Sequence, residues 1–136
     1  MKADMKKAWP HAKLMGAELV SFDPASSTIR MNFCAPDSFI TPRGSVQGGL
    51  VAGFLDEAMG WAYTHSTGGK QSPLMLDVNF SLLKPVPQGA LVGTGRVVKA
   101  GRRVLFLEAE LHNTDGTLLA RATSTAIPTI NPRIAQ

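Results

Sequence analysis

The segment from Gly48 to about Ser66 constrains the fold of this chain more than any other part of the sequence. It contains no proline, and apolar side chains fall on nearly every side of the helix that it would form. These side chains are Leu50, Val51, Phe54, Leu55, Ala58, Met59, Trp61, Ala62 and Tyr63. A helix that is apolar all round is typical of a buried one, so we expect the rest of the chain to wrap around it.

Before this helix, the sequence has the pattern of a short helix followed by a hairpin. Residues 9–14 are expected to be helical, and residues 17–22 and 28–33 alternate as two strands around a turn at residues 23–27. Residues 34–46 contain two prolines and a glycine and show no period, which predicts a loop that leads into the long helix.

After the helix, four strand-like segments follow one another with short turns between them. They are residues 74–83, 90–99, 103–112 and 117–127. Because the connections are short, we expect these strands to pair in sequence order as an antiparallel meander. One buried helix and about six strands predict a single α+β domain over residues 1–136, in which an antiparallel sheet wraps the helix.

Composition argues against several classes of protein. Hydrophobic residues make up 44% of the chain and charged residues 18%, and no apolar run approaches the roughly 18 residues of a membrane span. No apolar segment follows the basic start, so we expect a soluble, cytoplasmic protein. The single cysteine, Cys34, and three scattered histidines lack the spacing of metal ligands, and we therefore expect no metal.

The formal net charge is +4. A balance of this size suits a polyanionic ligand, or it serves solubility alone. The sequence contains no motif of a nucleic-acid reader, few aromatic residues and no dense basic stripe, so we expect no nucleic-acid partner.

Two glycines, Gly48 and Gly49, stand at the start of the predicted long helix. The first N–H groups of a helix have no partner inside it, and glycine lets another group approach the backbone closely. Together with the positive end of the helix dipole, such donors can stabilise the oxyanion that forms when a thioester carbonyl is attacked. The other interpretation is a tight junction between loop and helix that binds nothing.

Asp56 lies in the middle of the same helix, among apolar residues. An ionised carboxylate in such a place is costly unless it is paired or serves a function. It is therefore a candidate catalytic residue, or else a buried acid satisfied by a backbone, serine or threonine donor. The adjacent Glu57 points about 100° away on a helix, so the two do not act as a paired acid and base.

The spacing of these two features restricts how they could act together. Gly48 and Asp56 are eight residues apart, which is roughly 12 Å along a helix. One substrate carbonyl cannot touch both. If both serve one reaction, the carboxylate comes from a second copy of the helix that runs antiparallel to the first, which implies a two-fold dimer with two identical sites.

Four short motifs occur in order along the chain: residues 46–58, which contain Gly48 and Asp56, and residues 76–85, 101–103 and 115–120. In this order and spacing they resemble the PaaI-like and 4-hydroxybenzoyl-CoA thioesterase group of hotdog proteins, over about residues 15–125. The resemblance implies the hotdog fold, in which an antiparallel sheet wraps a long central helix. It also implies dimers whose sheets join edge to edge, and commonly a dimer of dimers.

The resemblance further implies roles for individual residues. The backbone N–H of Gly48 would polarise the thioester oxygen, with Gly49 next to the substrate, and Asp56 of the partner subunit would act as a general base on water or as a nucleophile. The sequence departs from the family at two catalytic positions. Gln47 stands where most members have histidine, and Thr41 stands where an asparagine or glutamine is usual.

Three basic residues fall where family members present charge to the phosphates of coenzyme A: Lys84, Arg102 and Arg103. Arginine suits phosphate because its planar donors can bind two oxygens. The other interpretation of these side chains is solvated charge at strand ends and turns. Coenzyme A would be part of the substrate, and no separate cofactor is expected.

The function predicted from the sequence is hydrolysis of an acyl-CoA thioester with an aryl or medium-length acyl group. The alternative is a hotdog module that binds acyl-CoA or another lipid thioester without cleaving it, because Thr41 and Gln47 depart from the family pattern. A hotdog dehydratase is a further alternative, but the acid and histidine pair that it would need on one loop and helix is absent.

Overall fold

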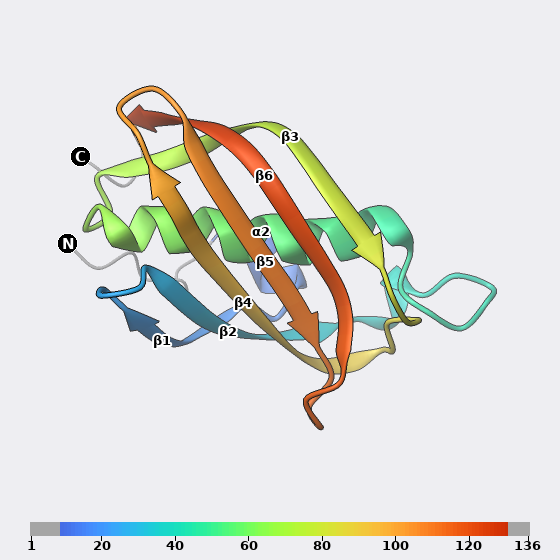
Figure 1. Ribbon diagram of the computed structural model, residues 1–136. Coiled ribbons are helices and arrows are strands. Elements are labelled where there is room, and N and C mark those ends of the chain that lie inside the picture. Colours follow the sequence, from blue (N-terminus) through green and yellow to red (C-terminus); the bar gives the residue numbers. More distant parts are fainter. Residues whose placement is uncertain (1–8, 131–136) are drawn as a thin grey trace.

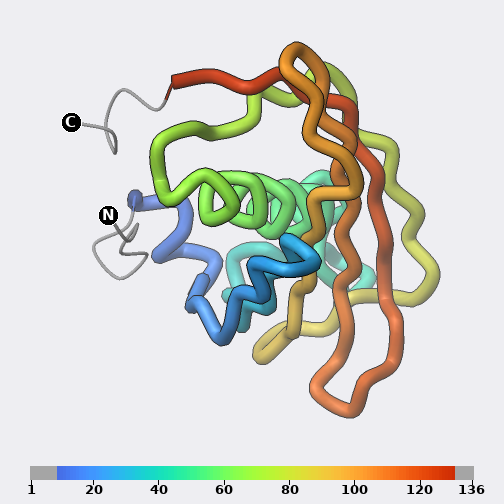
Figure 2. The backbone as a smooth tube through the Cα atoms, turned by 60° about the vertical axis from the view of Figure 1, so that its left-hand side comes forward, coloured from blue at the N-terminus to red at the C-terminus, as the bar shows by residue number. Residues whose placement is uncertain are grey.

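The computed structural model describes residues 9–130. A curved, six-stranded antiparallel sheet wraps one long helix, α2 (Figures 1 and 2). The elements in chain order are α1 (Pro10–Leu14), β1 (Glu18–Asp23), β2 (Thr28–Ala35), the 3₁₀ turn η2 (Asp37–Phe39), α2 (Gly48–Ser66), β3 (Gln71–Leu82), β4 (Gly89–Ala100), β5 (Leu105–His112) and β6 (Leu118–Ile130). The predicted α+β architecture, the two helices and the early hairpin are confirmed.

The predicted strand order is wrong in one respect. β4, β5 and β6 form a meander, but β3 pairs with β6 at the edge of the sheet, and β4 pairs with β2. The segment after β3 contains Pro85 and Pro87 and does not turn back as a hairpin. Instead the Lys84 N–H donates to the Leu119 carbonyl (3.1 Å), and Val86 is buried in the core. The chain thus crosses the end of the sheet before β4 begins.

Gly95 on β4 lies directly against the backbone of α2. A Cβ atom at this position would fall 2.5 Å from the carbonyl carbon of Ala58 and 3.0 Å from the backbone nitrogen of Met59. Both neighbours belong to the backbone of a helix, so neither can rotate away as a flexible side chain would. Glycine is therefore required here by the close approach of strand and helix.

Replacement of Gly95 by alanine is expected to destabilise the fold by about 3 kcal/mol, at the upper end of the range for overpacked cores. The added methyl group must push the helix and the strand apart, because no side chain can yield. Urea unfolding measures this effect as a lower midpoint. Gly60→Ala in α2 is the matched control, since its Cβ meets nothing within 4 Å and is expected to change stability by about 1 kcal/mol or less. Equal stabilities of both variants would contradict the prediction.

One stripe of α2 remains open in the single chain. Gly49 and Asp56 are exposed along it, and Ala52, Gly53 and Gly60 are partly exposed. The prediction of a helix buried all round is therefore wrong for the isolated chain, although the other sides of the helix are buried. Within residues 9–130, no helix is both long and apolar enough to cross a membrane.

The strand next to this stripe, β3, carries large apolar side chains that are not covered. Leu74, Leu76 and Leu82 are 54%, 59% and 51% exposed. β3 is also an edge strand, with β6 on one side and no described strand on the other. A long, apolar edge of this kind is typical of a surface that pairs with another chain.

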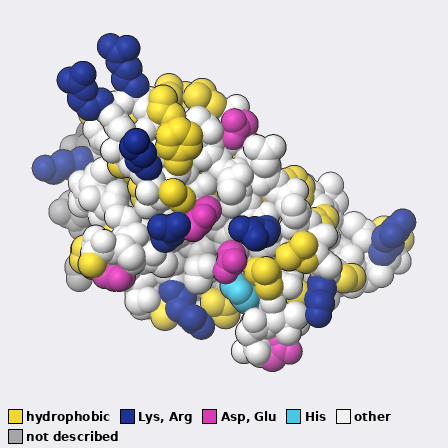
Figure 3. Space-filling model, in the orientation of Figure 1, with side chains coloured by type: hydrophobic (Ala, Val, Ile, Leu, Met, Phe, Trp, Pro, Cys, Tyr) yellow, Lys and Arg dark blue, Asp and Glu magenta, His cyan; other side chains and the backbone are white. Residues whose placement is uncertain are grey.

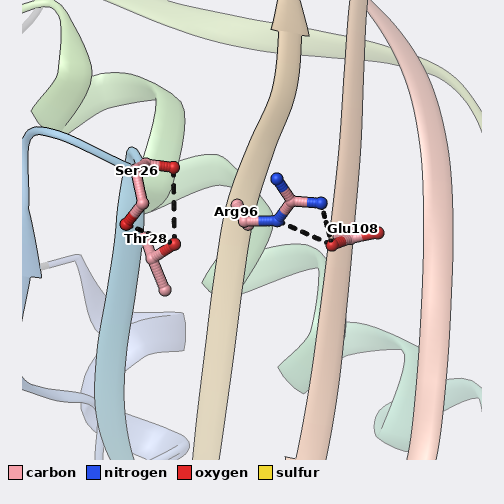
Figure 4. A network of polar contacts seen from close by, with 4 residues as sticks. All are labelled: Ser26, Thr28, Arg96 and Glu108. Atoms are coloured by element: carbon pink, nitrogen blue, oxygen red, sulfur yellow. Dashed lines mark hydrogen bonds and ion pairs between the residues drawn. The ribbon is translucent and has the colours of Figure 1, made fainter.

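The outer face of the sheet, which points away from α2, has a different character. At its centre Arg96 on β4 holds Glu108 on β5, with Nε and Nη2 each 2.7 Å from the same carboxylate oxygen (Figure 4). At the neighbouring hairpin the Ser26 hydroxyl donates to Thr28 Oγ1 over 3.0 Å. In the space-filling view, acidic and basic side chains alternate over the middle of this face (Figure 3). Such exposed pairs add little to stability.

Candidate active site

A groove of about 640 Å³ opens at the beginning of α2. The loop before the helix, the first turn of the helix and the segment after β3 form its walls. Its lining includes Thr41, Arg43, Gln47, Gly48 and Lys84. We call it the Gly48 groove. It brings together four residues that the sequence nominated at separate places, and it adds Arg43.

Gln47 is the N-cap of α2. Its side-chain oxygen accepts a hydrogen bond from the backbone N–H of Leu50 over 2.9 Å. This bond uses the amide oxygen and leaves the Nε2 hydrogens of Gln47 available as donors. Within the described part of the chain, the N–H groups of Gly48 and Gly49 have no acceptor. The first turn of α2 therefore offers two backbone donors and the positive end of the helix dipole to a negatively charged oxygen.

Thr41 also lines the Gly48 groove, but its hydroxyl is engaged in its own loop. It donates to the Ser45 carbonyl over 3.1 Å and accepts from the Arg43 N–H over 3.3 Å. The hydroxyl proton is thus used to close the turn that precedes Gln47. In this conformation Thr41 shapes the groove and has no hydrogen left to donate to a ligand.

A second groove, of about 440 Å³, opens beside the middle of α2. The side chains of Asp56 and Glu57 lie in it, together with His11 and Trp9 from the α1 region and Leu74 from β3. We call it the Asp56 groove. Asp56 itself is exposed in the single chain, so the expectation of a fully buried acid is wrong for one protomer. Its carboxylate faces the open stripe of α2 rather than the core.

The Asp56 carboxyl has a perturbed proton affinity. Desolvation by the surrounding protein atoms raises its pKa above the ordinary value of 3.8, and the negative charge of Glu57 raises the pKa further. The charge of His11 acts in the opposite direction and lowers this pKa. Solvent reaches the carboxylate through the groove, but the walls exclude enough water to disfavour the ionised form. A base with a raised pKa accepts a proton more readily than an ordinary aspartate.

The raised pKa predicts how Asp56 affects stability. The folded chain binds this proton more tightly than the unfolded chain, so the contribution of Asp56 is full below pH 3.8 and is lost as the pH rises through the raised pKa. Asp56→Asn removes the titration. We therefore expect the unfolding free energy of the variant, relative to that of the parent chain, to increase from acid to neutral pH. Paired urea titrations at several pH values measure this difference, and a difference that is constant with pH would contradict the prediction.

The two grooves do not meet within one chain. They share no lining residue, and Gly48 and Asp56 are separated by roughly 12 Å along the helix. The phosphate-binding candidates are also divided. Lys84 lines the Gly48 groove, whereas Arg102 and Arg103 lie in the turn between β4 and β5, at the opposite end of the sheet (Figure 1). One chain therefore holds two separate grooves.

Three charged or titratable residues that line the grooves were not nominated from the sequence as site residues: His11, Glu57 and Arg43. A signal exists for Arg43, because it lies in the loop between Thr41 and Gln47. No local pattern places His11 against Glu57, because the two are 46 residues apart in sequence.

A long helix wrapped by a six-stranded antiparallel sheet, with free backbone donors at the helix start and an acid on its exposed stripe, defines a hotdog-type protein. The sequence profile of the Thioesterase superfamily matches residues 43–120, which is more than half of the chain. The chain belongs to the thioesterase superfamily, and it is a thioester hydrolase.

Solved structures agree with this assignment. A phenylacetic acid degradation-related protein of Ralstonia eutropha is 30% identical, with a TM-score of 0.81 over 90% of this chain and 95% of that chain. The PaaI protein of the phenylacetic acid degradation operon of E. coli is 17% identical, with a TM-score of 0.80 over 92% of this chain and 88% of that chain. A Streptococcus mutans protein bound to acetyl-CoA is 22% identical, with a TM-score of 0.73 over 85% and 90% of the two chains. Comparison with curated proteins yields no significant match.

Proposed function

We propose that this thioester hydrolase cleaves acyl-CoA at two identical sites, each formed by the Gly48 groove of one copy and the Asp56 groove of a second copy. The observation that carries the proposal is the division of the site. One chain presents oxyanion donors and a carboxylate on the same helix, too far apart to reach one carbonyl, and both open to the outside. An antiparallel second copy of the helix would bring the two half-sites together.

The proposed dimer is supported by the surface next to both grooves. β3 is an apolar edge strand, and it runs along the open stripe of α2. Pairing of two β3 strands, antiparallel across a two-fold axis, would satisfy their free backbone groups and cover their exposed leucines. In each chain, Gly48 lies next to the C-terminal end of β3 and Asp56 lies next to its N-terminal end. Antiparallel pairing of two β3 strands would therefore bring Gly48 of one copy to the same end as Asp56 of the other.

The chemistry follows from the groups at this junction. The N–H groups of Gly48 and Gly49 hold the thioester oxygen, while the partner's Asp56 takes a proton from water and the resulting hydroxide adds to the carbonyl carbon. The tetrahedral intermediate then collapses, the carbon–sulfur bond breaks, and the coenzyme A thiolate receives the proton from the Asp56 carboxyl. We favour this general-base role over a covalent one for Asp56. No covalent enzyme intermediate is then formed.

Recognition of coenzyme A would use the cations at the rim. Lys84 lies in the Gly48 groove of one copy. In the proposed dimer, Arg102 and Arg103 of the second copy lie at the same end of the joined sheet, because the two β3 strands run in opposite directions. Removal of the cation in Lys84→Ala is expected to raise KM for acyl-CoA by about tenfold, the equivalent of one charge-assisted hydrogen bond, with little change in kcat.

The measurement for Lys84 compares an acyl-CoA with the N-acetylcysteamine thioester of the same acid, which lacks the phosphates. KM for the short thioester should not change. Arg30→Ala, an exposed cation on the outer face of the sheet, serves as the matched control. An equal rise in KM for both substrates would rule out phosphate recognition by Lys84.

For the acyl group we propose an aryl or medium-length chain. Trp9, Trp61 and Met75 line the Asp56 groove and offer an apolar surface for it. The similarity to proteins of phenylacetic acid degradation favours the aryl class.

The proposed function is tested by thiol release over a panel of acyl-CoA esters that spans acetyl, octanoyl, palmitoyl, benzoyl and phenylacetyl groups. We expect turnover that is highest with the aryl or medium-chain esters. The second candidate is a binding module, and the engaged hydroxyl of Thr41 favours it. Tight binding of an acyl-CoA without thiol release from any ester would establish the module and overturn the enzyme.

A further inference from the structure

A small polar network joins α1 to the middle of α2 inside the Asp56 groove. Glu57 is at its centre, with a side chain that is only 13% exposed. Its two carboxylate oxygens have different partners. Trp61 Nε1–H donates to one oxygen over 3.1 Å, and His11 Nε2 lies 3.2 Å from the other.

The chemistry of this contact places a hydrogen on Nε2 of His11, in the neutral and in the protonated ring alike. A carboxylate only accepts hydrogen bonds, so Nε2 of His11 carries the hydrogen in this contact. A largely buried carboxylate is costly without such donors, and here one comes from the same helix and the other from α1. The bond from His11 is thus a polar link that holds α1 against α2.

The position of the network relates it to the site. His11, Glu57 and Trp61 line the same groove as Asp56, and Glu57 is its neighbour in sequence. Among residues 9–130, the titratable groups that line this groove are His11, Asp56 and Glu57. The charge of Glu57 disfavours ionisation of Asp56, and the positive charge of His11, present when its ring is protonated, favours it. The two charges therefore oppose each other at the carboxylate.

We propose that His11 is a positioning residue for the hydrolysis: through Glu57 it holds α1 as a wall of the Asp56 groove, and it offsets the charge of Glu57 beside the Asp56 carboxylate. The proposal rests on the proposed function, because Asp56 is the base in that reaction. It assigns no contact between His11 and the substrate. Two consequences are separable: a geometric one carried by the hydrogen bond, and an electrostatic one carried by the charge.

Profiles of kcat/KM against pH separate the geometric effect of His11 from its electrostatic effect. In such a profile the acid limb is the range in which the rate falls because Asp56 becomes protonated. His11→Ala is expected to move the acid limb to higher pH by roughly half a pH unit, less than the 1–3 units of a directly contacting charge, and to lower the rate on that limb about threefold. Glu57→Gln, which keeps an acceptor for Trp61, is expected to move the limb to lower pH. Loss of the hydrogen bond between α1 and α2 in His11→Ala is also expected to lower the plateau rate. His11→Gln restores a donor to Glu57 without the charge, so its plateau rate should return to the parent value while the acid limb stays displaced.

The matched control is His112→Ala, which removes another histidine next to a glutamate, 3.6 Å from Glu110 on the outer face of the sheet. Its profile should coincide with that of the parent chain. The proposal is overturned if the acid limb of kcat/KM moves in the same direction in His11→Ala and Glu57→Gln, or moves in neither. A purely structural role would not displace the limb in opposite directions in the two variants.

A carbon-13 titration of the Asp56 carboxyl provides the same test without turnover. Opposite displacements of its midpoint in His11→Ala and Glu57→Gln support the electrostatic part of the inference whether or not acyl-CoA is hydrolysed. Hydrolysis by the parent chain with equal Asp56 midpoints in all variants would sink the inference and leave the proposed function intact.

Discussion

Asp56→Asn is expected to lower kcat/KM for thioester hydrolysis by about 10²–10⁴-fold, the usual contribution of a general base. Asparagine has nearly the same shape but cannot accept a proton from water at neutral pH. The fold should be retained, because Asp56 is exposed in the chain and its ionised form is disfavoured there. Initial rates of thiol release, together with an unfolding curve of the same preparation, measure both effects.

A control for this substitution is Asp115→Asn in the turn between β5 and β6. The Asp115 carboxylate accepts a hydrogen bond from the Thr117 N–H over 2.9 Å, and an asparagine oxygen can accept the same bond. Its activity should equal that of the parent chain. Turnover near the parent value in Asp56→Asn would remove Asp56 from the mechanism.

Gly48→Pro is expected to reduce kcat by about 10²–10³-fold, because it deletes one oxyanion donor. Proline is tolerated at the first position of a helix. The preceding Gln47 already has the extended conformation that proline requires, with φ −58° and ψ 136°. A Cβ at residue 48 would come no closer than 3.4 Å to Leu82. The matched variant is Gly48→Ala, which adds the Cβ and keeps the N–H, so it should retain most activity.

A mixture of Gly48→Pro and Asp56→Asn chains tests whether the site is shared between copies. Each variant alone forms two defective sites. A mixed dimer has one site with both defects and one with neither, so random exchange should restore about a quarter of the parent activity. Mixing without recovery, under conditions where the chains demonstrably exchange, would show that the two half-sites do not cooperate across a dimer.

Much of the fold follows from local patterns in the sequence. The apolar segment at residues 48–66 predicts α2 with the bounds that the structure shows, and turn residues separate most of the strands. The partner of β3 was predicted wrongly, since the rule that consecutive strands pair assumes a connection that turns back. The connection after β3 contains Pro85 and Pro87; it is held by a bond from Lys84 N–H to Leu119 on β6 and by a bond from Val46 N–H to the Val86 carbonyl. The strand order thus depends on contacts between distant segments, which the hydrophobic periodicity of the sequence does not indicate.

The same limit applies to the candidate site: residues within one element could be predicted from the sequence, and contacts between separate segments could not. Gly48 and Asp56 could be found because both stand in one helix with a recognisable start and a conspicuous acid. The engagement of the Thr41 hydroxyl with Ser45 could not be found, because it depends on how the loop closes. The contact of His11 with Glu57 could not be found either, because it joins segments that are brought together only by folding.

The contact between Gly95 and α2 determines more than packing. Successive residues of a helix are about 100° apart, so Ala58, which rests on Gly95, is on the side of α2 opposite to Asp56. The contact with β4 limits how far α2 can rotate about its own axis and how closely it can approach the sheet. Gly95 therefore helps to set the direction in which the Asp56 carboxylate points, although it lies on the opposite side of α2 and has no side chain. A bulkier residue at position 95 is expected to change the direction of the Asp56 carboxylate even in a chain that still folds.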